Sequence, residues 1–187
     1  PLIPSGLTQP PLSLPFEVGT TWSFTGGPHS AWGAGSAWGA LDFAPPGEPL
    51  GCVVSDAWAI SVADGLIVRS GEGSVLLDLD GDGIEQTGWV ILYLHIDSYQ
   101  RIPAGTYVHK GDYIGHPSCE GGVSFGTHLH LARKYNGEWI PADQQIPFNL
   151  DGWISEGTGV EYDGYLRRGT EVVEAWDDYV AENQITH

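Results

Sequence analysis

Short runs of hydrophobic residues, separated by turns, recur through the middle of this chain. In several runs apolar and polar residues alternate with a period of two, the pattern of a strand with one buried face. The 27 Gly and 13 Pro are spread over the whole sequence and favour many short strands over long helices. We therefore predict a mainly β fold, an antiparallel sheet system with little helix. The expected strands are residues 52–54, 59–62, 65–70, 74–79, 89–96, 107–108, 113–114 and 128–134.

Composition and pattern divide the chain into an N-terminal segment (1–21), a central domain (22–142) and a C-terminal extension (143–187). Residues 1–21 are rich in Pro and weakly periodic, which indicates an extended segment lying across the domain. Residues 22–42 look like a loop of Gly, Ala, Ser and Trp that ends in a short apolar stretch. Residues 143–187 have a looser pattern, with a predicted hairpin through Gly164 that joins 160–162 to 165–168. No internal repeat or linker is evident, so we predict one domain at 22–142 with the C-terminal extension packed on it.

The charge balance argues against several classes of partner. The 187 residues carry 24 Asp and Glu against seven Lys and Arg, a formal net charge of −17. Nucleic acid is not expected as a partner, because phosphate binding needs clustered Lys and Arg. Anionic membranes and wall polymers are disfavoured for the same reason. No run of about 18 apolar residues is present, so we predict no membrane span, and we expect a monomer.

The first residue and the two cysteines suggest export. The sequence begins at Pro1 without an initiator Met, which we interpret as a mature product whose export signal has been removed. We therefore expect a secreted, periplasmic or extracellular protein. Cys52 and Cys119 would then form a disulfide, since oxidising compartments preserve such bonds. The alternative is a pair of buried free thiols in a cytosolic protein.

Two histidines are separated by one residue in the run Gly126-Thr127-His128-Leu129-His130-Leu131. Side chains at i and i+2 of a strand leave the same face of a sheet. We therefore expect both imidazoles to point into one site, with the two leucines packed into a core. A rigid strand of this kind can hold a metal ion.

A third histidine, His95, follows the apolar run 90–94. Strand alternation predicts that Ile91, Tyr93 and His95 share one face, so Tyr93 is expected to line a groove beside His95. A lone histidine in a strand is more often structural than functional. The His-x-His pair, Asp42 in an apolar setting, and His29 after a Gly-Gly turn make the functional reading stronger.

These residue types match a zinc site. Catalytic zinc takes three protein ligands, commonly His and carboxylate, and leaves one position for water. His29, Asp42 and one histidine of the His128/His130 pair would supply that set. From the residues alone the alternative stays open that Asp42 caps a turn.

The order of these motifs resembles that of the M23 metallopeptidases, which include lysostaphin-type and LasA-like endopeptidases. The resemblance covers roughly residues 22–142, and the gap between His29 and Asp42 resembles the LasA-like branch. It implies a β-sheet metallopeptidase domain with long loops that form a groove. The elements that carry it are His29, Ala40-Leu41-Asp42-Phe43, Ala63-Asp64-Gly65-Leu66-Ile67, Tyr93-Leu94-His95-Ile96, Val108-His109-Lys110-Gly111-Asp112-Tyr113-Ile114-Gly115 and Gly126-Thr127-His128-Leu129-His130-Leu131.

The resemblance also implies a role for each site residue. His29, Asp42 and His130 would bind Zn²⁺, while His95 and His128 would flank the attacking water and the substrate carbonyl. The chain has no His-Glu-x-x-His motif to supply a glutamate base, so two unligated histidines are suited to accept the proton and to stabilise the oxyanion. The sequence does not decide which histidine does which.

An acidic loop forms a second candidate metal site. Asp78, Asp80 and Asp82 occupy positions 1, 3 and 5 of a pattern like that of calcium loops, with Gly at position 6. Position 12 is Trp89 instead of Glu, which excludes a full EF-hand. Two interpretations stay open: a Ca²⁺ site completed by Glu85 or backbone carbonyls, and a solvated acidic turn.

Four other side chains have open assignments. Trp32 and Trp38 lie between the first two proposed zinc ligands, where they would either wall a substrate groove or pack over a sheet edge. His109 and His116 lie in turn contexts, and we expect both to be exposed and structural.

We predict a secreted zinc metalloendopeptidase that cleaves peptidoglycan cross-links or other glycine-rich peptides, since members of the resembled family cut such bonds. The main alternative is a catalytically inactive relative that binds cell wall or a partner. An aromatic-rich carbohydrate-binding module would explain the eight Trp but not the histidines.

Overall fold

The computed structural model describes residues 3–47 and 51–187. Within these ranges the chain is built of strands, and every pairing between strands is antiparallel. The one helical element described is a 3-10 turn, η1 (Ala181–Asn183). The prediction of a mainly β, antiparallel fold with little helix is therefore confirmed. The strands are β1 (Thr21–His29), β2 (Ala40–Ala44), β3 (Ala59–Ile60), β4 (Gly65–Gly71), β5 (Ser74–Asp78), β6 (Trp89–Leu94), β7 (Tyr107–Val108), β8 (Tyr113–Gly115), β9 (Leu129–Tyr135), β10 (Glu138–Trp139), β11 (Asn149–Leu150), β12 (Trp153–Gly157), β13 (Gly164–Arg168), β14 (Glu171–Glu174) and β15 (Gln184–Thr186).

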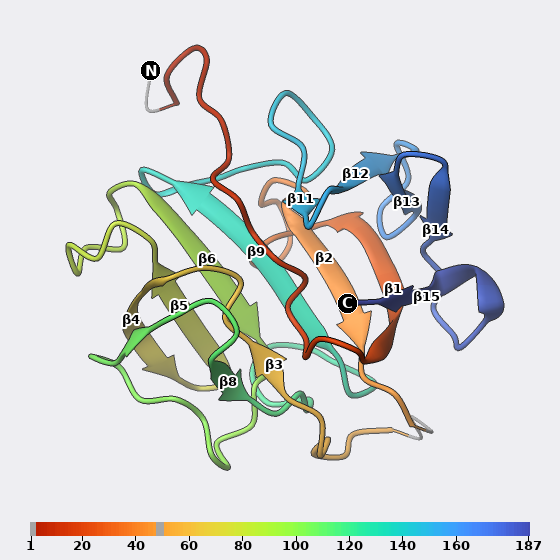
Figure 1. The fold of residues 1–187 in the computed structure, drawn as a ribbon, viewed down its shortest axis with the longest axis horizontal. Helices are drawn as coiled ribbons and strands as arrows, with labels where there is room; N and C mark the ends of the chain where they lie inside the picture. Colours follow the sequence, from red (N-terminus) through yellow and green to blue (C-terminus); the bar gives the residue numbers. More distant parts are fainter. Residues whose placement is uncertain (1–2, 48–50) are drawn as a thin grey trace.

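The largest sheet has the strand order β15-β1-β2-β9-β6-β5-β4-β7, with β10 added beside β9. Figure 1 shows its central strands β2, β9 and β6. Strand β9 is central, with β2 on one side and β6 on the other. This order brings together the chain segments near residues 29, 42, 95 and 130, which are far apart in the sequence. The fold thus places all of the predicted site elements on neighbouring strands.

The two faces of this sheet are covered differently. Leu41 of β2 and Leu129 and Leu131 of β9 belong to the main hydrophobic core. On the opposite face, Ala40 and Ala132 join a smaller apolar cluster. The prediction that Leu129 and Leu131 pack into a core is confirmed, and by strand alternation Asp42 and His130 lie on the opposite face.

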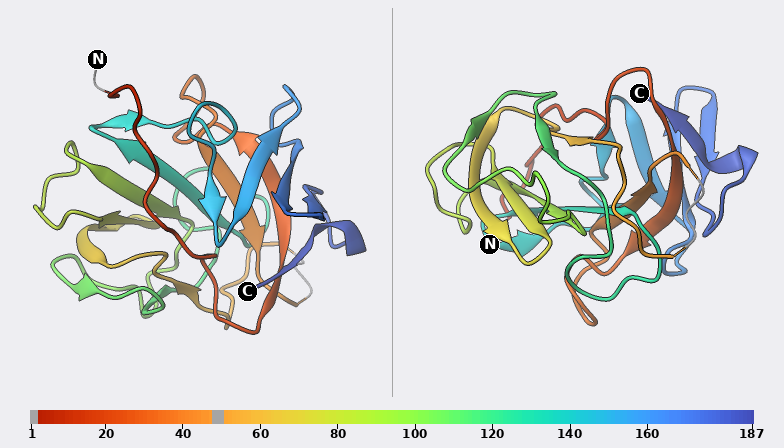
Figure 2. Two further views of the ribbon diagram at one scale, coloured as in Figure 1. Left: turned by 45° about the horizontal axis from the view of Figure 1, so that its top comes forward. Right: turned by 90° about the horizontal axis from the view of Figure 1, so that it is seen from below.

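Both terminal regions pack against the sheet. The N-terminal segment crosses the core side of the sheet in extended form, and its Leu12, Leu14 and Phe16 are buried there (Figures 1 and 2). Strands β11 to β14 form a separate four-stranded sheet that lies beside β1, while β15 pairs with β1. The boundaries at residues 21/22 and 142/143 stay a prediction.

Three local expectations were wrong. Residues 22–42 contain the long strand β1, whose register shifts at Phe24/Gly26 and Gly26/His29 interrupt the alternation that marks a strand. Residues 52–54 form no strand, and residues 160–162 form a turn instead of a hairpin arm. Strand β13, which begins at Gly164, pairs with β12 and β14. The Gly, Ser and Glu residues of β12 interrupt the apolar pattern of a strand, so the sequence pattern did not identify β12 as the partner of β13.

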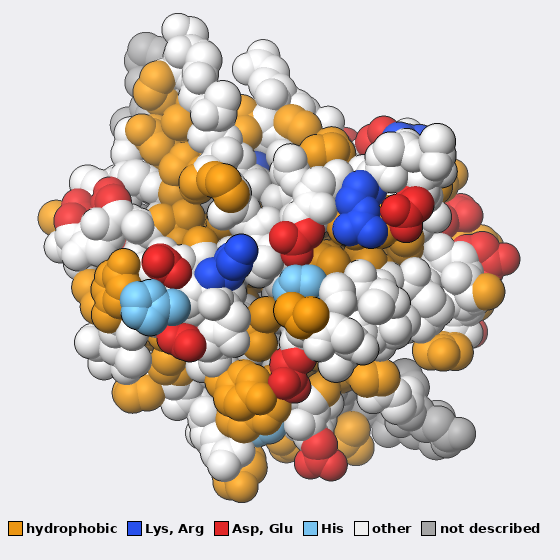
Figure 3. Space-filling model, viewed as in Figure 1, with side chains coloured by type: hydrophobic (Ala, Val, Ile, Leu, Met, Phe, Trp, Pro, Cys, Tyr) orange, Lys and Arg blue, Asp and Glu red, His pale blue; other side chains and the backbone are white. Residues whose placement is uncertain are grey.

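The surface matches the acidic composition. On the face seen in Figure 3, acidic side chains are dispersed among polar and apolar atoms. No helix in the described part of the chain is long and apolar enough to cross a bilayer.

Candidate metal centre

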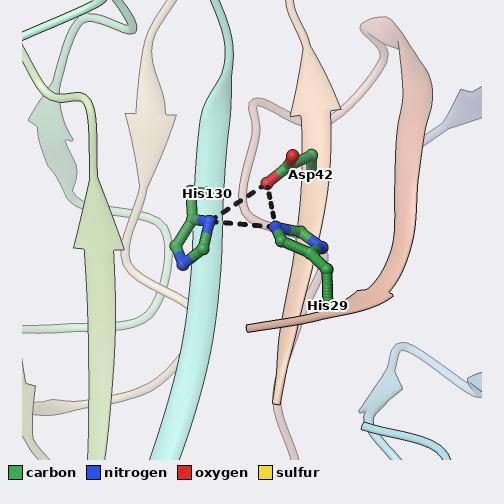
Figure 4. A group of neighbouring side chains, drawn as sticks. All are labelled: His29, Asp42 and His130. Atoms are coloured by element: carbon green, nitrogen blue, oxygen red, sulfur yellow. Dashed lines mark hydrogen bonds and ion pairs between the residues drawn. The ribbon is translucent and has the colours of Figure 1, made fainter. Parts of the chain in front are cut away.

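Three adjacent strands supply the side chains of the candidate metal centre. His29 is the last residue of β1, Asp42 lies in β2, and His130 lies in β9. In the β2–β9 ladder Asp42 is directly opposite His130, and β1 borders β2 on its other side. Figure 4 shows the three side chains converging from these strands.

The three potential ligand atoms form a nearly equilateral triangle. The Asp42 Oδ1 atom is 3.1 Å from His29 Nε2 and 3.3 Å from His130 Nδ1, and the two ring nitrogens are 3.1 Å apart. In tetrahedral zinc sites, bonds of about 2.0–2.1 Å place neighbouring ligand atoms about 3.3 Å apart. The spacing in this centre is close to that value.

The outer nitrogen of each ring is fixed by a backbone carbonyl. His29 Nδ1 donates to the Gly27 carbonyl at 2.7 Å, and His130 Nε2 donates to the Ala31 carbonyl at 2.9 Å. Since a carbonyl oxygen can only accept, these bonds leave lone pairs on His29 Nε2 and His130 Nδ1, the atoms that face Asp42. Asp42 Oδ1 is buried and receives no hydrogen bond. Two lone pairs and a carboxylate oxygen directed at one point are the donor set of a divalent cation, so the residues fit zinc.

The charges of the centre are coupled. Burial opposes charge on the His29 ring, but the Asp42 carboxylate outweighs this effect and the pKa of His29 is raised. Burial likewise opposes charge on Asp42, yet the surrounding histidines, above all His29 and His128, hold the pKa of its carboxyl well below the usual value. The site therefore keeps a carboxylate in a buried position.

Glycine is required where β1 approaches β2. A Cβ atom on Gly26 would lie 2.9 Å from Asp42 Oδ2 and 3.0 Å from Asp42 Cβ. A Cβ on Gly27 would lie 2.6 Å from the backbone of Asp163. The Gly-Gly pair before His29 thus lets β1 pack closely against the carboxylate.

The two other histidines lie beside this centre. The His95 and His128 rings are 4.6 Å apart between centroids. His95 Nδ1 donates to the Glu120 carbonyl at 3.0 Å, and His128 Nδ1 donates to the Gly126 carbonyl at 2.8 Å. In both rings Nε2 is left for chemistry, and that of His128 is 3.5 Å from Asp42 Oδ2. Burial and the neighbouring His128 lower the pKa of His95 to about 4.

The strand parity predicted for His95 was wrong. Tyr93 is fully buried in the main core and does not line a groove. Its hydroxyl donates to the Ile60 carbonyl at 3.0 Å and accepts from the Val62 amide at 2.9 Å. Strand β6 ends at Leu94, and His95 has a φ of 68°, in the left-handed region. This backbone turn carries the His95 ring to the face opposite Tyr93.

Comparisons with known proteins agree with this geometry. No family model matches the chain. Protease LasA of Pseudomonas aeruginosa strain PAO1 is 30% identical over 145 residues, as is LasA of strain UCBPP-PA14. Each alignment covers 73% of this chain and 31% of the relative, so the chain spans about a third of the length of these relatives. The solved structure of the M23 metalloprotease pseudoalterin, from the deep sea, shares the fold with a TM-score of 0.70 and 23% identity, over 92% of this chain and 97% of that chain.

This chain belongs to the M23 metallopeptidase family. The resemblance inferred from the order of its motifs is confirmed.

A groove passes over the candidate metal centre of this M23 domain. It has a volume of about 1600 Å³, and all five candidate site residues line it, as does Trp32, whose side chain is half exposed. Trp38 is not among the lining residues. Its backbone carbonyl accepts from the amide of Ala142, in the segment after β10. Phe125 also lines the groove and is 91% exposed.

Tyr162 is a groove residue that the sequence did not reveal. Its ring stacks on His29 with 4.2 Å between centroids and 20° between planes. The Tyr162 carbonyl accepts from the Gly27 amide at 2.7 Å, and its amide donates to the Pro28 carbonyl at 3.1 Å. The residue comes from the turn before β13, and no motif marks it as a neighbour of β1.

The disulfide predicted between Cys52 and Cys119 is present, with 67 residues of sequence separation. It lies beside the segment that carries His128. Ser118, next to Cys119, donates its amide to the His95 carbonyl, and its own carbonyl accepts from the His128 amide. The disulfide therefore anchors the backbone that holds His95 and His128.

The expectations for the two remaining histidines had different outcomes. The His109 side chain is 74% exposed, as expected. His116 is buried, which corrects the prediction of an exposed residue. Its Nδ1 donates to the Ala57 carbonyl at 2.9 Å and its Nε2 contacts Gln100 Oε1 at 3.0 Å, so His116 ties two loops together.

Proposed function

We propose that this M23 domain is a zinc-dependent endopeptidase, with His29, Asp42 and His130 as the metal ligands. The observation that carries the proposal is the convergence of two ring lone pairs and a buried carboxylate oxygen within 3.1–3.3 Å of one another. His95 and His128 line the same groove beside these three residues. A protein that only binds cell wall would have no need of this second pair.

The zinc ion, when bound, supplies acidification of a water molecule and polarisation of the substrate carbonyl. The side chains of this chain handle the proton and the charge. The His95 ring donates from Nδ1 to the Glu120 carbonyl and, with its pKa lowered to about 4, is neutral near pH 7, so Nε2 presents a lone pair to the attacking water. His128 lines the same groove, with Nε2 3.5 Å from Asp42 Oδ2, and we assign this ring to stabilising the oxyanion of the peptide.

We propose glycine-rich peptides, including peptidoglycan cross-links, as the substrate. M23 membership supports this choice, and so does the groove, whose walls combine aromatic side chains with the acidic Glu72, Glu161, Asp177 and Asp178. Acidic walls disfavour anionic polymers and accept neutral or basic peptides. The disulfide supports a secreted or periplasmic location.

Two variants and one control test the proposal. His130→Ala should lose bound zinc in elemental analysis, because one of three ligands is removed. His95→Ala should keep zinc but lose about 10²–10⁴-fold in kcat on pentaglycine, the usual contribution of a general base. His109→Ala, at an exposed histidine away from the groove, should keep both.

The outcomes separate the alternatives. Zinc binding by the wild type without turnover of pentaglycine or cross-linked muropeptides would favour the inactive binding module. Full activity of His95→Ala, or one zinc per chain in His130→Ala, would reject the roles assigned.

A further inference from the structure

The loop between β5 and β6 contains three converging carboxylates that the proposed peptidase does not use. Asp78 is the last residue of β5, and Asp80 and Asp82 follow it in the loop. One oxygen from each carboxylate lies within 4.8 Å of those of the other two. Like charges at this spacing repel one another unless a cation lies between them.

Backbone amides fold the loop around these side chains. Asp78 Oδ2 accepts from the Gly83 amide at 2.8 Å, Asp80 Oδ1 from the Asp82 amide at 3.1 Å, and Asp82 Oδ1 from the Ile84 amide at 2.7 Å. Each bond uses one oxygen of its carboxylate, and the second oxygen of Asp82 accepts from Thr87 Oγ1 at 2.6 Å. The second oxygens of Asp78 and Asp80 receive no hydrogen bond from the described residues.

The strongest evidence for a ligand is the buried Asp78. Its side chain has 0% exposure, and its Oδ1 has no hydrogen-bond partner. A buried carboxylate oxygen without a partner is unfavourable, because neither water nor protein replaces its hydration. Among the described residues no basic side chain forms an ion pair with these three aspartates, and Arg69 and Lys134 both pair with Glu85.

We propose that the β5–β6 loop binds one calcium ion through Asp78, Asp80 and Asp82. The donors are all oxygens, which hard cations prefer, and the irregular loop suits the flexible coordination of Ca²⁺ better than the strict octahedron of Mg²⁺. Trp89 stands where a bidentate Glu would complete an EF-hand, so waters or backbone carbonyls fill the remaining positions. This places the affinity in the range of extracellular modules, with a Kd of about 10⁻⁴–10⁻³ M.

The ion stabilises the hairpin without taking part in catalysis. The loop is at the start of β6, whereas His95 follows the other end of this strand. Binding should therefore raise the melting temperature and leave peptidase activity unchanged.

The experiment is a Ca²⁺ titration of the zinc-loaded protein, followed by melting temperature and by calorimetry. At ten times the Kd the melting temperature should rise by about 3–6 °C, and calorimetry should give about one site. The double variant Asp80→Asn/Asp82→Asn should lose this response. In Ca²⁺-free buffer, with the protein kept zinc-loaded, the same variant should melt higher than the wild type, because the repulsion is relieved. The control Asp56→Asn changes an exposed aspartate outside the loop and should respond like the wild type.

Mg²⁺ at equal ionic strength distinguishes a site from screening of the −17 net charge. An equal rise with Mg²⁺, or an equal rise in the double variant, would reduce the effect to screening and overturn the proposal. If the double variant does not fold, the wild type alone decides, because calorimetry without saturable Ca²⁺ binding would also overturn it.

Discussion

The placement of Tyr93 can be tested by removing a single oxygen atom. In Tyr93→Phe the ring stays in the core, but the Ile60 carbonyl loses its donor and the Val62 amide loses its acceptor. Tyr93, Ile60 and Val62 are all buried. The variant therefore isolates the two hydrogen bonds that attach β6 to the segment around β3.

The expected loss of stability follows from those two bonds. Leaving buried polar groups without partners costs about 1–3 kcal/mol. In a chain of this size each kcal/mol corresponds to about 2–4 °C, so the melting temperature should fall by about 2–12 °C. Because Tyr93 does not line the groove, kcat and KM measured well below the transition should stay within about two-fold of the wild type.

A matched control uses another tyrosine. The Tyr113 hydroxyl donates to Glu17 Oε2 at 2.9 Å, and this pair is exposed. Tyr113→Phe should therefore change stability by no more than about 0.5 kcal/mol. The assay is thermal or denaturant unfolding of both variants, with peptidase kinetics in parallel. An unchanged melting temperature for Tyr93→Phe together with a raised KM would indicate that Tyr93 lines the groove. That result would refute its placement in the core.

Four further predictions concern the candidate metal centre and its surroundings. Gly26→Ala should lower zinc content, because the new Cβ would lie 2.9 Å from Asp42 Oδ2, whereas Gly71→Ala, with no atom within 4 Å, should retain the metal; equal zinc in both would contradict the close approach. Reduction of the disulfide, whose partners are 67 residues apart, should destabilise the protein by about 2–4 kcal/mol, and an unchanged unfolding midpoint in reductant would argue against it. In the zinc-free protein the raised pKa of His29 contributes stability below about pH 6.5 that is lost as the pH rises through the folded-state pKa, while the lowered pKa of Asp42 contributes stability above about pH 4 that is lost on acidification. Zinc needs unprotonated ring nitrogens, so the rise in melting temperature on adding zinc should grow from pH 5 to pH 8, and a pH-independent rise would count against these ligands.

The sequence alone determined the features that depend on local periodicity. The spacing of His128 and His130, with leucines at the alternate positions, determined that both imidazoles leave one face while Leu129 and Leu131 enter the core. Strand alternation is a property of each extended residue, so it can be read without knowing the partner strand. The order of short motifs likewise indicated the M23 family before any contact was known.

Local periodicity failed where the backbone leaves the extended conformation. Alternation placed His95 with Tyr93, but the left-handed φ of His95 turns its ring to the opposite face. Likewise the register shifts in β1 concealed that strand within a Gly-rich stretch. Such departures are stable because neighbouring segments hold them, as the Glu120 carbonyl holds the His95 ring.

The composition of the metal centre was decided by the tertiary structure. His128 and His130 have the same parity, and only the β2–β9 register, which sets His130 opposite Asp42, distinguishes the candidate ligand from the candidate catalytic residue. The carbonyls of Gly27 and Ala31, which fix the ring nitrogens that face the carboxylate, are contacts that no motif specifies. Local sequence fixes the direction of a side chain relative to its own strand. The register between strands, and therefore which side chains meet, depends on how distant segments pack into one core.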